Sequence, residues 1–140
     1  MEDCIFCKIA KYQADAHIVY EDSTVLAILD TDPISDGHTL IIPKKHVPGI
    51  HKLSDEIGTK IMHAAKVLAG IIENTFNYDG IMIMGVSGTF QDVPHFHLHV
   101  FGRKKTNDIE MKFPVGTNRD PQHLIENATK IKAGYQKLVA

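Results

Sequence analysis

Polar and hydrophobic residues alternate at positions 95–101, which read His-Phe-His-Leu-His-Val-Phe. Side chains of a β-strand point to opposite faces with a period of two. The pattern therefore predicts a strand whose three imidazoles share one face, while Phe96, Leu98 and Val100 share the other. Two strand steps would separate neighbouring histidines on that face by roughly 6.5–7 Å.

Helical periodicity marks two longer segments. Residues 54–76 begin with Ser54 and two acidic residues, which is typical of a helix start. Residues 121–138 follow Asp120, which we expect to cap a C-terminal helix. Both segments predict helices with one apolar face. The apolar positions are Ile57, Ile61, Ala64, Ala65, Leu68, Ile71, Ile72 and Phe76 in the first, and Leu124, Ala128, Ile131, Tyr135 and Leu138 in the second.

Short apolar segments between turn signals predict the other strands. These strands are 18–20, 24–29, 39–42 and 81–84. A glycine-bearing loop through Gly85, Gly88 and Gln91 joins the last of them to the histidine strand, so these two strands should pair antiparallel. Residues 103–119 look irregular. Strands around one long helix predict a single α+β domain over residues 1–140, with a mostly antiparallel sheet.

Composition excludes several classes of protein. The net charge of −2 over 140 residues and the pI near 6.5 give no global basic field for nucleic acid or a membrane surface. No apolar run reaches transmembrane length, and the first residues are acidic where a signal peptide would be basic. We therefore expect a cytoplasmic protein. In a reducing compartment the two cysteines, Cys4 and Cys7, are poor candidates for a structural disulfide.

The alternating histidines are the main candidate for an active site. Such a row can present a nucleophile, a proton donor and an orienting group to one phosphate. The alternatives are a solvent-facing strand and a metal-binding face, because imidazole is a common zinc ligand. Residues at i, i+2 and i+4 spread along a strand, however, and cannot easily meet at one small ion. We therefore interpret the segment as catalytic.

With this histidine segment the sequence resembles the histidine triad (HIT) family of nucleotide hydrolases and transferases. The family pattern, His-φ-His-φ-His-φ-φ with φ apolar, matches residues 95–101 at every position. Further matches, in the family's order, are Cys-Ile-Phe-Cys-Lys-Ile at 4–9, Leu-Asp at 29–30, Gly-His-Thr-Leu-Ile-Ile-Pro-Lys-Lys-His at 37–46 and Gln-x-Val-x-His at 91–95. The resemblance covers residues 4–103. It implies a five-stranded antiparallel sheet with one long central helix.

The resemblance implies roles for the histidines. His97 corresponds to the nucleophile that attacks the α-phosphorus and forms a nucleotidyl-histidine intermediate. His99 corresponds to the residue that contacts the phosphate oxygens, and His38 to a supporting histidine near the nucleophile. The resemblance also implies that His95, the first histidine of the triad, is an active-site residue. An imidazole with an ordinary pKa is largely neutral at pH 7, so it is available as a nucleophile.

The same resemblance implies a nucleotide site and a zinc site. Asp30 corresponds to the acidic residue that holds the ribose hydroxyls, and Phe6, Ile9 and Ile28 to the wall of the base pocket. The resemblance also implies that Gln91 and Asp92 bind the substrate near its leaving group, and that His99 contacts the phosphate. Relatives that share the N-terminal motif bind a structural zinc, which implies Cys4, Cys7, His46 and His95 as ligands. The alternative is a pair of free thiols. A thioredoxin-like site is disfavoured because the start of the chain shows neither the strand nor the helix that it needs.

The expected function is cleavage of a purine nucleotide at its α-phosphate with release of AMP, by a homodimer that needs no cofactor for catalysis. A nucleoside phosphoramidate or an aminoacyl-adenylate is the preferred substrate, and a dinucleoside polyphosphate the alternative. Asp92 departs from the Ser or Thr that many relatives carry there, and its charge would repel a phosphate. Because of Asp92, a sensor module that binds nucleotide without turnover remains an alternative function. A zinc-binding structural protein is the remaining alternative.

Overall fold

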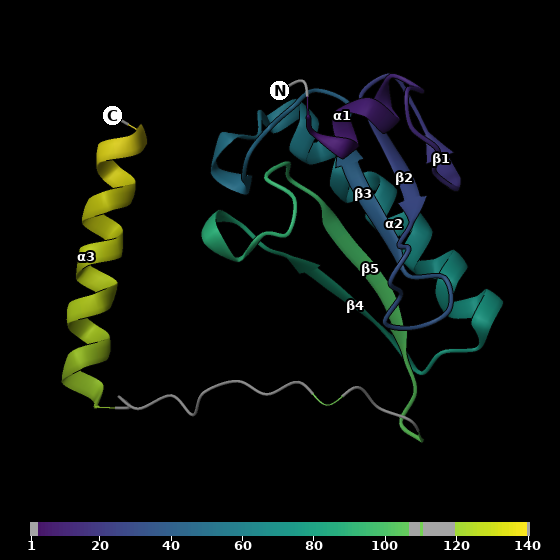
Figure 1. Cartoon of the computed structure of the whole chain (residues 1–140). Helices are drawn as coiled ribbons and strands as arrows, with labels where there is room; N and C mark the ends of the chain where they lie inside the picture. Colours follow the sequence, from purple (N-terminus) through teal and green to yellow (C-terminus); the bar gives the residue numbers. More distant parts are fainter. Residues whose placement is uncertain (1–2, 107–109, 111–119, 140) are drawn as a thin grey trace. The chain divides into compact units, whose positions relative to one another are not determined.

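The computed structural model of the chain describes residues 3–106, 110 and 120–139. The chain falls into two compact units, residues 1–109 and 110–140. Figure 1 labels the elements of both units. In chain order they are α1 (Ile5–Ala10), β1 (Ile18–Glu21), β2 (Val25–Leu29), β3 (Thr39–Pro43), the 3-10 helix η1 (Ile50–Lys52), α2 (Asp55–Phe76), β4 (Gly80–Gly85), the 3-10 helix η2 (Gly88–Phe90), β5 (Leu98–Arg103) and α3 (Pro121–Val139).

The five strands form one antiparallel sheet in the order β1-β2-β3-β5-β4. Its centre is the pair β3 and β5, where Thr39 lies opposite Val100 and Leu40 opposite His99. The expected antiparallel pairing of the 81–84 strand with the histidine strand is confirmed, with Ile83 opposite Val100. The α+β class and the antiparallel five-stranded sheet were thus correctly predicted from the sequence.

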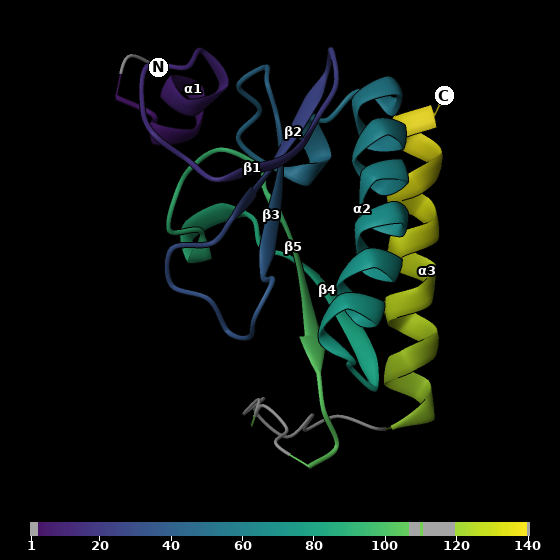
Figure 2. The same cartoon turned by 90° about the vertical axis from the view of Figure 1, so that its right-hand side faces the viewer.

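Helix α2 covers one face of the sheet (Figure 2). Ser54 caps it as expected, since its hydroxyl accepts the backbone N–H of Ile57 at 3.4 Å. The helix ends at Asn77, which adopts the left-handed conformation with φ of 54°. Two positions of the predicted apolar face, Ile71 and Phe76, are 54% and 36% exposed in the described structure, so the buried face is narrower than the sequence suggested.

The opposite face of the sheet carries a second apolar cluster and helix α1. Phe6 and Ile9 of α1 pack against β2 and β3, on residues that include Ile28 and Leu40. The expectation that the start of the chain lacks a helix was wrong. Helix α1 has only six residues, and Cys4 caps it without a side-chain hydrogen bond. The tertiary contacts of Phe6 and Ile9 therefore stabilise a helix whose sequence shows no start signal.

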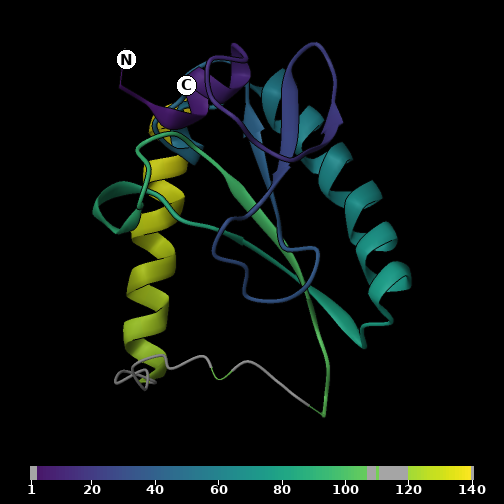
Figure 3. The same ribbon diagram turned by 45° about the vertical axis from the view of Figure 1, so that its right-hand side comes forward.

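Strand β5 begins later than the alternation predicted. The ladder starts at Leu98, so His95 and His97 precede it, and the expectation of one strand over all three histidines was wrong. Pro94 directly precedes the segment, and the N–H of Phe96 donates to the carbonyl of Val47 in a loop instead of to β3. Figure 3 shows the green segment before β5 passing beside the purple helix α1.

Helix α3 belongs to the second unit and spans Pro121–Val139, close to the expected 121–138. The N–H of Gln122 donates to Oδ1 of Asp120, which acts as the expected cap. The irregular segment predicted at 103–119 lies mostly outside the described residues. Among the helices that the structure describes, none combines the length and apolar character needed to cross a bilayer.

Candidate functional site: a histidine cavity beside a Cys/His cluster

The alternation of residues 96–100 sorts the side chains as predicted, although the ladder is shorter. Phe96, Leu98 and Val100 belong to the core that packs against α2. His97 and His99 lie on the other side, with ring centroids 5.0 Å apart. The sheet therefore separates the structural side chains of this segment from its imidazoles.

His97 is buried, yet it lines a cavity. Its Nδ1 lies 2.8 Å from the backbone carbonyl oxygen of His95, and a carbonyl only accepts, so Nδ1 carries the proton of the neutral ring. The Nε2 atom of neutral His97 then holds a free lone pair. The ring of Phe6 packs edge-on against the ring of His97, with 5.2 Å between the ring centroids, and restricts the rotation of the imidazole.

His38 and His99 form a directed pair. The N–H of Ile34 donates to Nδ1 of His38 at 3.1 Å, so neutral His38 carries its proton on Nε2. That Nε2 lies 2.9 Å from Nδ1 of His99 and donates to it. Neutral His99 is therefore protonated on Nε2. The two hydrogen bonds leave His99 with an N–H donor on a ring whose centroid lies 5.0 Å from that of His97.

Burial favours the neutral forms of His38 and His99. The pKa of His99 is lowered to about 4, chiefly by burial and also by the neighbouring His97 and His38, against the opposing effect of the Asp30 and Asp92 carboxylates. Burial also lowers the pKa of His38, partly offset by Asp30. The donor and acceptor roles assigned to His38 and His99 are thus those of their neutral rings.

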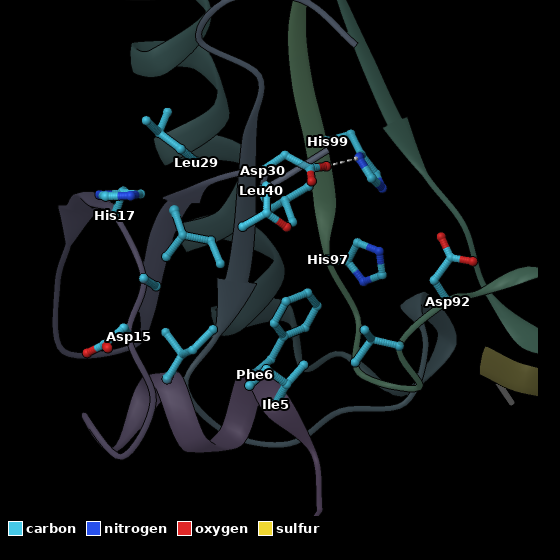
Figure 4. A pocket seen from close by; sticks show the side chains of 15 residues that line it. Ile5, Phe6, Asp15, His17, Leu29, Asp30, Leu40, Asp92, His97 and His99 are labelled. Atoms are coloured by element: carbon cyan, nitrogen blue, oxygen red, sulfur yellow. Dashed lines mark ion pairs between the residues drawn. The ribbon is translucent and has the colours of Figure 1, made fainter. Parts of the chain in front are cut away.

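Asp30 closes the site at the end of β2. Its Oδ2 lies 3.5 Å from Nδ1 of His38 and 4.0 Å from Nδ1 of His99, the contact drawn as a dashed line in Figure 4. Three ligand atoms of this group lie within 4.8 Å of one another. Two nitrogens on one tetrahedral zinc would be about 3.3 Å apart. The 2.9 Å contact between His38 and His99 is shorter and fits a hydrogen bond better than a shared ion.

The cavity has a volume of about 580 Å³. Of the residues expected to bind nucleotide or to act on it, those found in its wall are Phe6, Ile9, Ile28, Asp30, Asp92, His97 and His99. His38 is not a lining residue, but it contacts the lining residue His99. Gln91 and His95 are not among the described lining residues, and the side-chain oxygen of Gln91 instead accepts the N–H of Gly88.

Sequence reasoning missed part of the wall, namely Ile5, Asp15, Ala16, His17, Leu29, Thr31, Leu40 and Val93. Leu40 lies opposite Ile28 in the register of β2 and β3, so a predicted pairing of these strands would have placed both at the cavity. Asp15 and His17 lie across the cavity from His97 (Figure 4). No motif marks those two residues, because the loop that presents them has no periodic pattern.

Four side chains behind the cavity form a second constellation, the Cys/His cluster of Cys4, Cys7, His46 and His95. Their ligand atoms all lie within 4.8 Å of one another. The closest sulfur–nitrogen distances are 3.3 Å from Cys7 to His46, 3.4 Å from Cys4 to His95 and 3.5 Å from Cys7 to His95. Sulfur and nitrogen bound to one tetrahedral zinc would be about 3.6 Å apart.

The surroundings of the cluster also suit a metal. Nε2 of His95 donates to the carbonyl oxygen of Pro43 at 2.8 Å, which leaves its Nδ1 unprotonated toward the cysteines. Burial raises the pKa of Cys7, with Cys4 adding to the effect, so the Cys7 thiol favours its neutral form unless a cation stabilises the thiolate. The donor set and spacing fit a closed Cys₂His₂ zinc site, as expected from the resemblance.

Comparison with curated proteins identifies relatives over most of the chain. The family model of the HIT domain matches residues 11–106. Protein hit of Bacillus subtilis is 37% identical over 109 residues, which are 76% of this chain and 75% of that protein. Adenylylsulfatase HINT3 of Arabidopsis thaliana is 32% identical over 105 residues, 74% of this chain and 53% of that protein.

Solved structures agree with this assignment. A HIT family protein from Bacillus anthracis has a TM-score of 0.85 and 35% identity, with 96% of this chain and 97% of that chain covered. A zinc-bound histidine triad family protein from Mycobacterium smegmatis has a TM-score of 0.74 and 31% identity, with 82% of this chain and 85% of that chain covered. The sheet, the histidines and the relatives agree, and the chain belongs to the HIT domain family.

Proposed function

We propose that this protein is a nucleotide hydrolase or transferase that cleaves a purine nucleotide at its α-phosphate, with His97 as the nucleophile. The observation that carries the proposal is the 2.8 Å contact between Nδ1 of His97 and the carbonyl of His95. It leaves the Nε2 lone pair of a neutral imidazole at a cavity large enough for a ligand. No adjacent general base is needed.

In the proposed reaction, Nε2 of His97 forms a bond to the α-phosphorus while the bond from phosphorus to the leaving group breaks. The leaving group takes that electron pair and, if it is an amine, a proton from solvent. Water then forms a bond to the phosphorus and loses a proton to solvent while the phosphorus–nitrogen bond breaks, and its electron pair returns to Nε2, which releases AMP and neutral His97. The Nε2–H of His99 would donate to a phosphate oxygen, where negative charge grows in the transition state.

The rest of the cavity supports a nucleotide as the ligand. Asp30 offers a carboxylate that can accept two hydroxyl hydrogen bonds, as the ribose of a nucleotide would supply. Phe6, Ile9 and Ile28 give an apolar wall for a base. The relative from Arabidopsis thaliana is named an adenylylsulfatase, which is consistent with cleavage at the phosphate of an adenylate. A phosphoramidate or aminoacyl-adenylate remains our preferred substrate.

We propose a structural role for zinc in the Cys/His cluster. Zinc there would tie α1 to the segment before β5 and would supply no catalysis. His95 would then be a ligand whose carbonyl, not its ring, serves the active site. The expected homodimer stays a prediction, which analytical ultracentrifugation of the full chain would test.

The decisive experiment compares the wild type with His97→Asn and with His63→Asn, a change at an exposed histidine of α2. Each protein is mixed with an adenosine phosphoramidate, and AMP release and a covalent adenylyl adduct are followed by mass spectrometry. We expect AMP and a transient adduct in the wild type and the His63 control, and neither in His97→Asn. Full turnover by His97→Asn would overturn the assignment of the nucleophile.

The competing function is a sensor that binds nucleotide without turnover, which the carboxylate of Asp92 keeps open. It predicts AMP binding by the wild type with no hydrolysis of any adenylate or dinucleotide tried. The same assay therefore separates an enzyme from a binding module.

A further inference from the structure

A second cavity adjoins the histidine cavity. It has a volume of about 520 Å³, and it shares Ile5, Asp92 and Val93 with the first. The described residues found only in its wall are Asp3, Cys4, His46, Pro48 and Pro94. The two cavities therefore adjoin at Ile5, Asp92 and Val93, and the second lies on the side of Cys4 and His46 of the Cys/His cluster.

Asp92 lies beside the reacting end of the first cavity. Figure 4 shows its carboxylate on the side of His97 and His99, while Asp15 and His17 lie across the cavity. Its negative charge also reaches His99, where it opposes the fall in pKa that burial causes. A nucleotide with its ribose at Asp30 would thus leave the region of Asp92 to the group on the far side of the α-phosphate.

The wall that the two cavities share carries the negative charge of Asp92. None of the described residues lining either cavity is a lysine or arginine. Asp3 has an ion pair with Lys8 at 3.6 Å, but within the described part of the chain Asp92 has no ion pair with a lysine or arginine. A zinc ion held by two thiolates and two neutral imidazoles would carry no net charge, so it would not neutralise this wall.

We propose that the second cavity binds the leaving group and that Asp92 selects leaving groups that carry a positive charge. The substrate class is then an adenylate of an amine with an ammonium group beyond the scissile bond, such as a diamine or a basic amino acid. A polyphosphate leaving group would meet a carboxylate and no cation, and would be disfavoured. This inference rests on the proposed function and specifies the part of the substrate that AMP does not contain.

The test uses three N-alkyl phosphoramidates of AMP whose tails have equal length and end in ammonium, methyl or carboxylate. For the wild type we expect kcat/KM to be higher for the ammonium tail than for the methyl tail by up to about five-fold, as for an accessible ion pair. The carboxylate tail should be the poorest of the three. Raised ionic strength should reduce the spread, because salt screens exposed charges.

The readout is the ratio between substrates, which does not depend on the absolute rate of a variant. Asp92→Asn should bring the ratio of ammonium to methyl close to one. Asp15→Asn removes the same charge at the opposite end of the first cavity and should keep the wild-type ratio. Equal ratios in the wild type and Asp92→Asn would overturn the role of Asp92, and so would a lost preference in Asp15→Asn alone.

A binding measurement separates this inference from the proposed function. Calorimetry with His97→Asn gives the Kd of the same three compounds in the absence of turnover, and the ammonium compound should bind most tightly. Should the wild type hydrolyse none of them, the proposed function fails, while the order of Kd values still decides the role of Asp92. Turnover of all three at one rate would overturn the charge selection and leave the hydrolase intact.

Discussion

The carbonyl oxygen of His95 lies 2.8 Å from Nδ1 of His97, while the ring of the same His95 faces Cys4 and Cys7. One residue thus joins the Cys/His cluster to the proposed nucleophile. Its Nε2–H is fixed by Pro43, so both ends of the ring are held. The orientation of the His97 ring therefore depends on how firmly the cluster holds His95.

The first prediction concerns the metal. Protein purified under reducing conditions should contain about one zinc ion per chain, and a chelator or Cys7→Ser should remove it and lower the Tm, because the cluster ties α1 to the segment before β5. Elemental analysis and calorimetry measure both effects. His51→Asn, at an exposed histidine outside the cluster, is the matched control. A wild-type protein that contains no metal, and whose Tm is the same with and without the chelator, would rule out the zinc site.

The second prediction concerns the pair His38 and His99. Replacing His38 with Ala removes the donor that fixes the proton of His99 on Nε2, so kcat should fall by about 10- to 100-fold with a smaller change in KM. A merely structural role would not move the pH profile, whereas loss of the donor should also shift its acidic limb. Steady-state kinetics across pH, with His63→Asn as control, measure both. Unchanged kcat in His38→Ala would contradict the pair's role.

The third prediction is a loss of stability in acid. The folded pKa of His99 is about 4, below its ordinary value of 6.5. Between these values the unfolded chain binds a proton that the folded chain does not, so the contribution is complete above pH 6.5 and is lost as pH falls toward 4. The loss amounts to at most about 3 kcal/mol.

His99→Gln removes this titration and should flatten the dependence of unfolding free energy on pH. Urea unfolding followed by circular dichroism suits this chain, which has no tryptophan. The comparison is between slopes of the two proteins at matched pH, so acid effects on other groups are common to both. Parallel slopes would show that His99 titrates normally.

Much of the site follows from the sequence because side-chain alternation survives even where the ladder does not. His97, His99, Phe96 and Leu98 lie on the faces that a period of two assigns to them. The strand boundary was missed because the N–H of Phe96 finds its acceptor in a distant loop, and one sequence does not show such a partner.

Other features of the site could not be predicted for different reasons. Helix α1 is too short for a periodic pattern, and its stability comes from the contacts of Phe6 and Ile9 with the sheet. The pairing of His38 with His99 joins residues 61 positions apart, and it depends on the register of β3 and β5. The positions of Asp15 and His17 come from a loop, where tertiary contacts decide the geometry.

The fourth prediction concerns Asp30. Asp30→Asn should raise KM for adenylate substrates by about ten-fold or more, because hydrogen bonds to a charged acceptor are worth about 1.5–3 kcal/mol. The wild type should lose the same factor with a dideoxy substrate that lacks both ribose hydroxyls. The variant and the dideoxy substrate together should cost no more than either alone. Additive losses would show that Asp30 acts elsewhere than at the ribose.

The fifth prediction concerns Gly37, which precedes His38 with φ of 76°. A Cβ there would clash with the ring of Phe76, so Gly37→Ala should lower the free energy of unfolding by about 1–3 kcal/mol. Gly58 in α2 has open space where a Cβ would lie, and Gly58→Ala should raise stability by about 0.5–1 kcal/mol. Urea titrations of both variants decide the matter, and equal effects would contradict it.

Helix α1 places Phe6 and Cys7 next to each other in the chain, one against the rings of His95 and His97 and the other in the Cys/His cluster. A protease that cut just beyond this helix would remove an aromatic neighbour of the nucleophile and two of the four sulfur and nitrogen donors in one event. Trimming of the N-terminus would thus open the wall of the histidine cavity and break the Cys/His cluster in a single step.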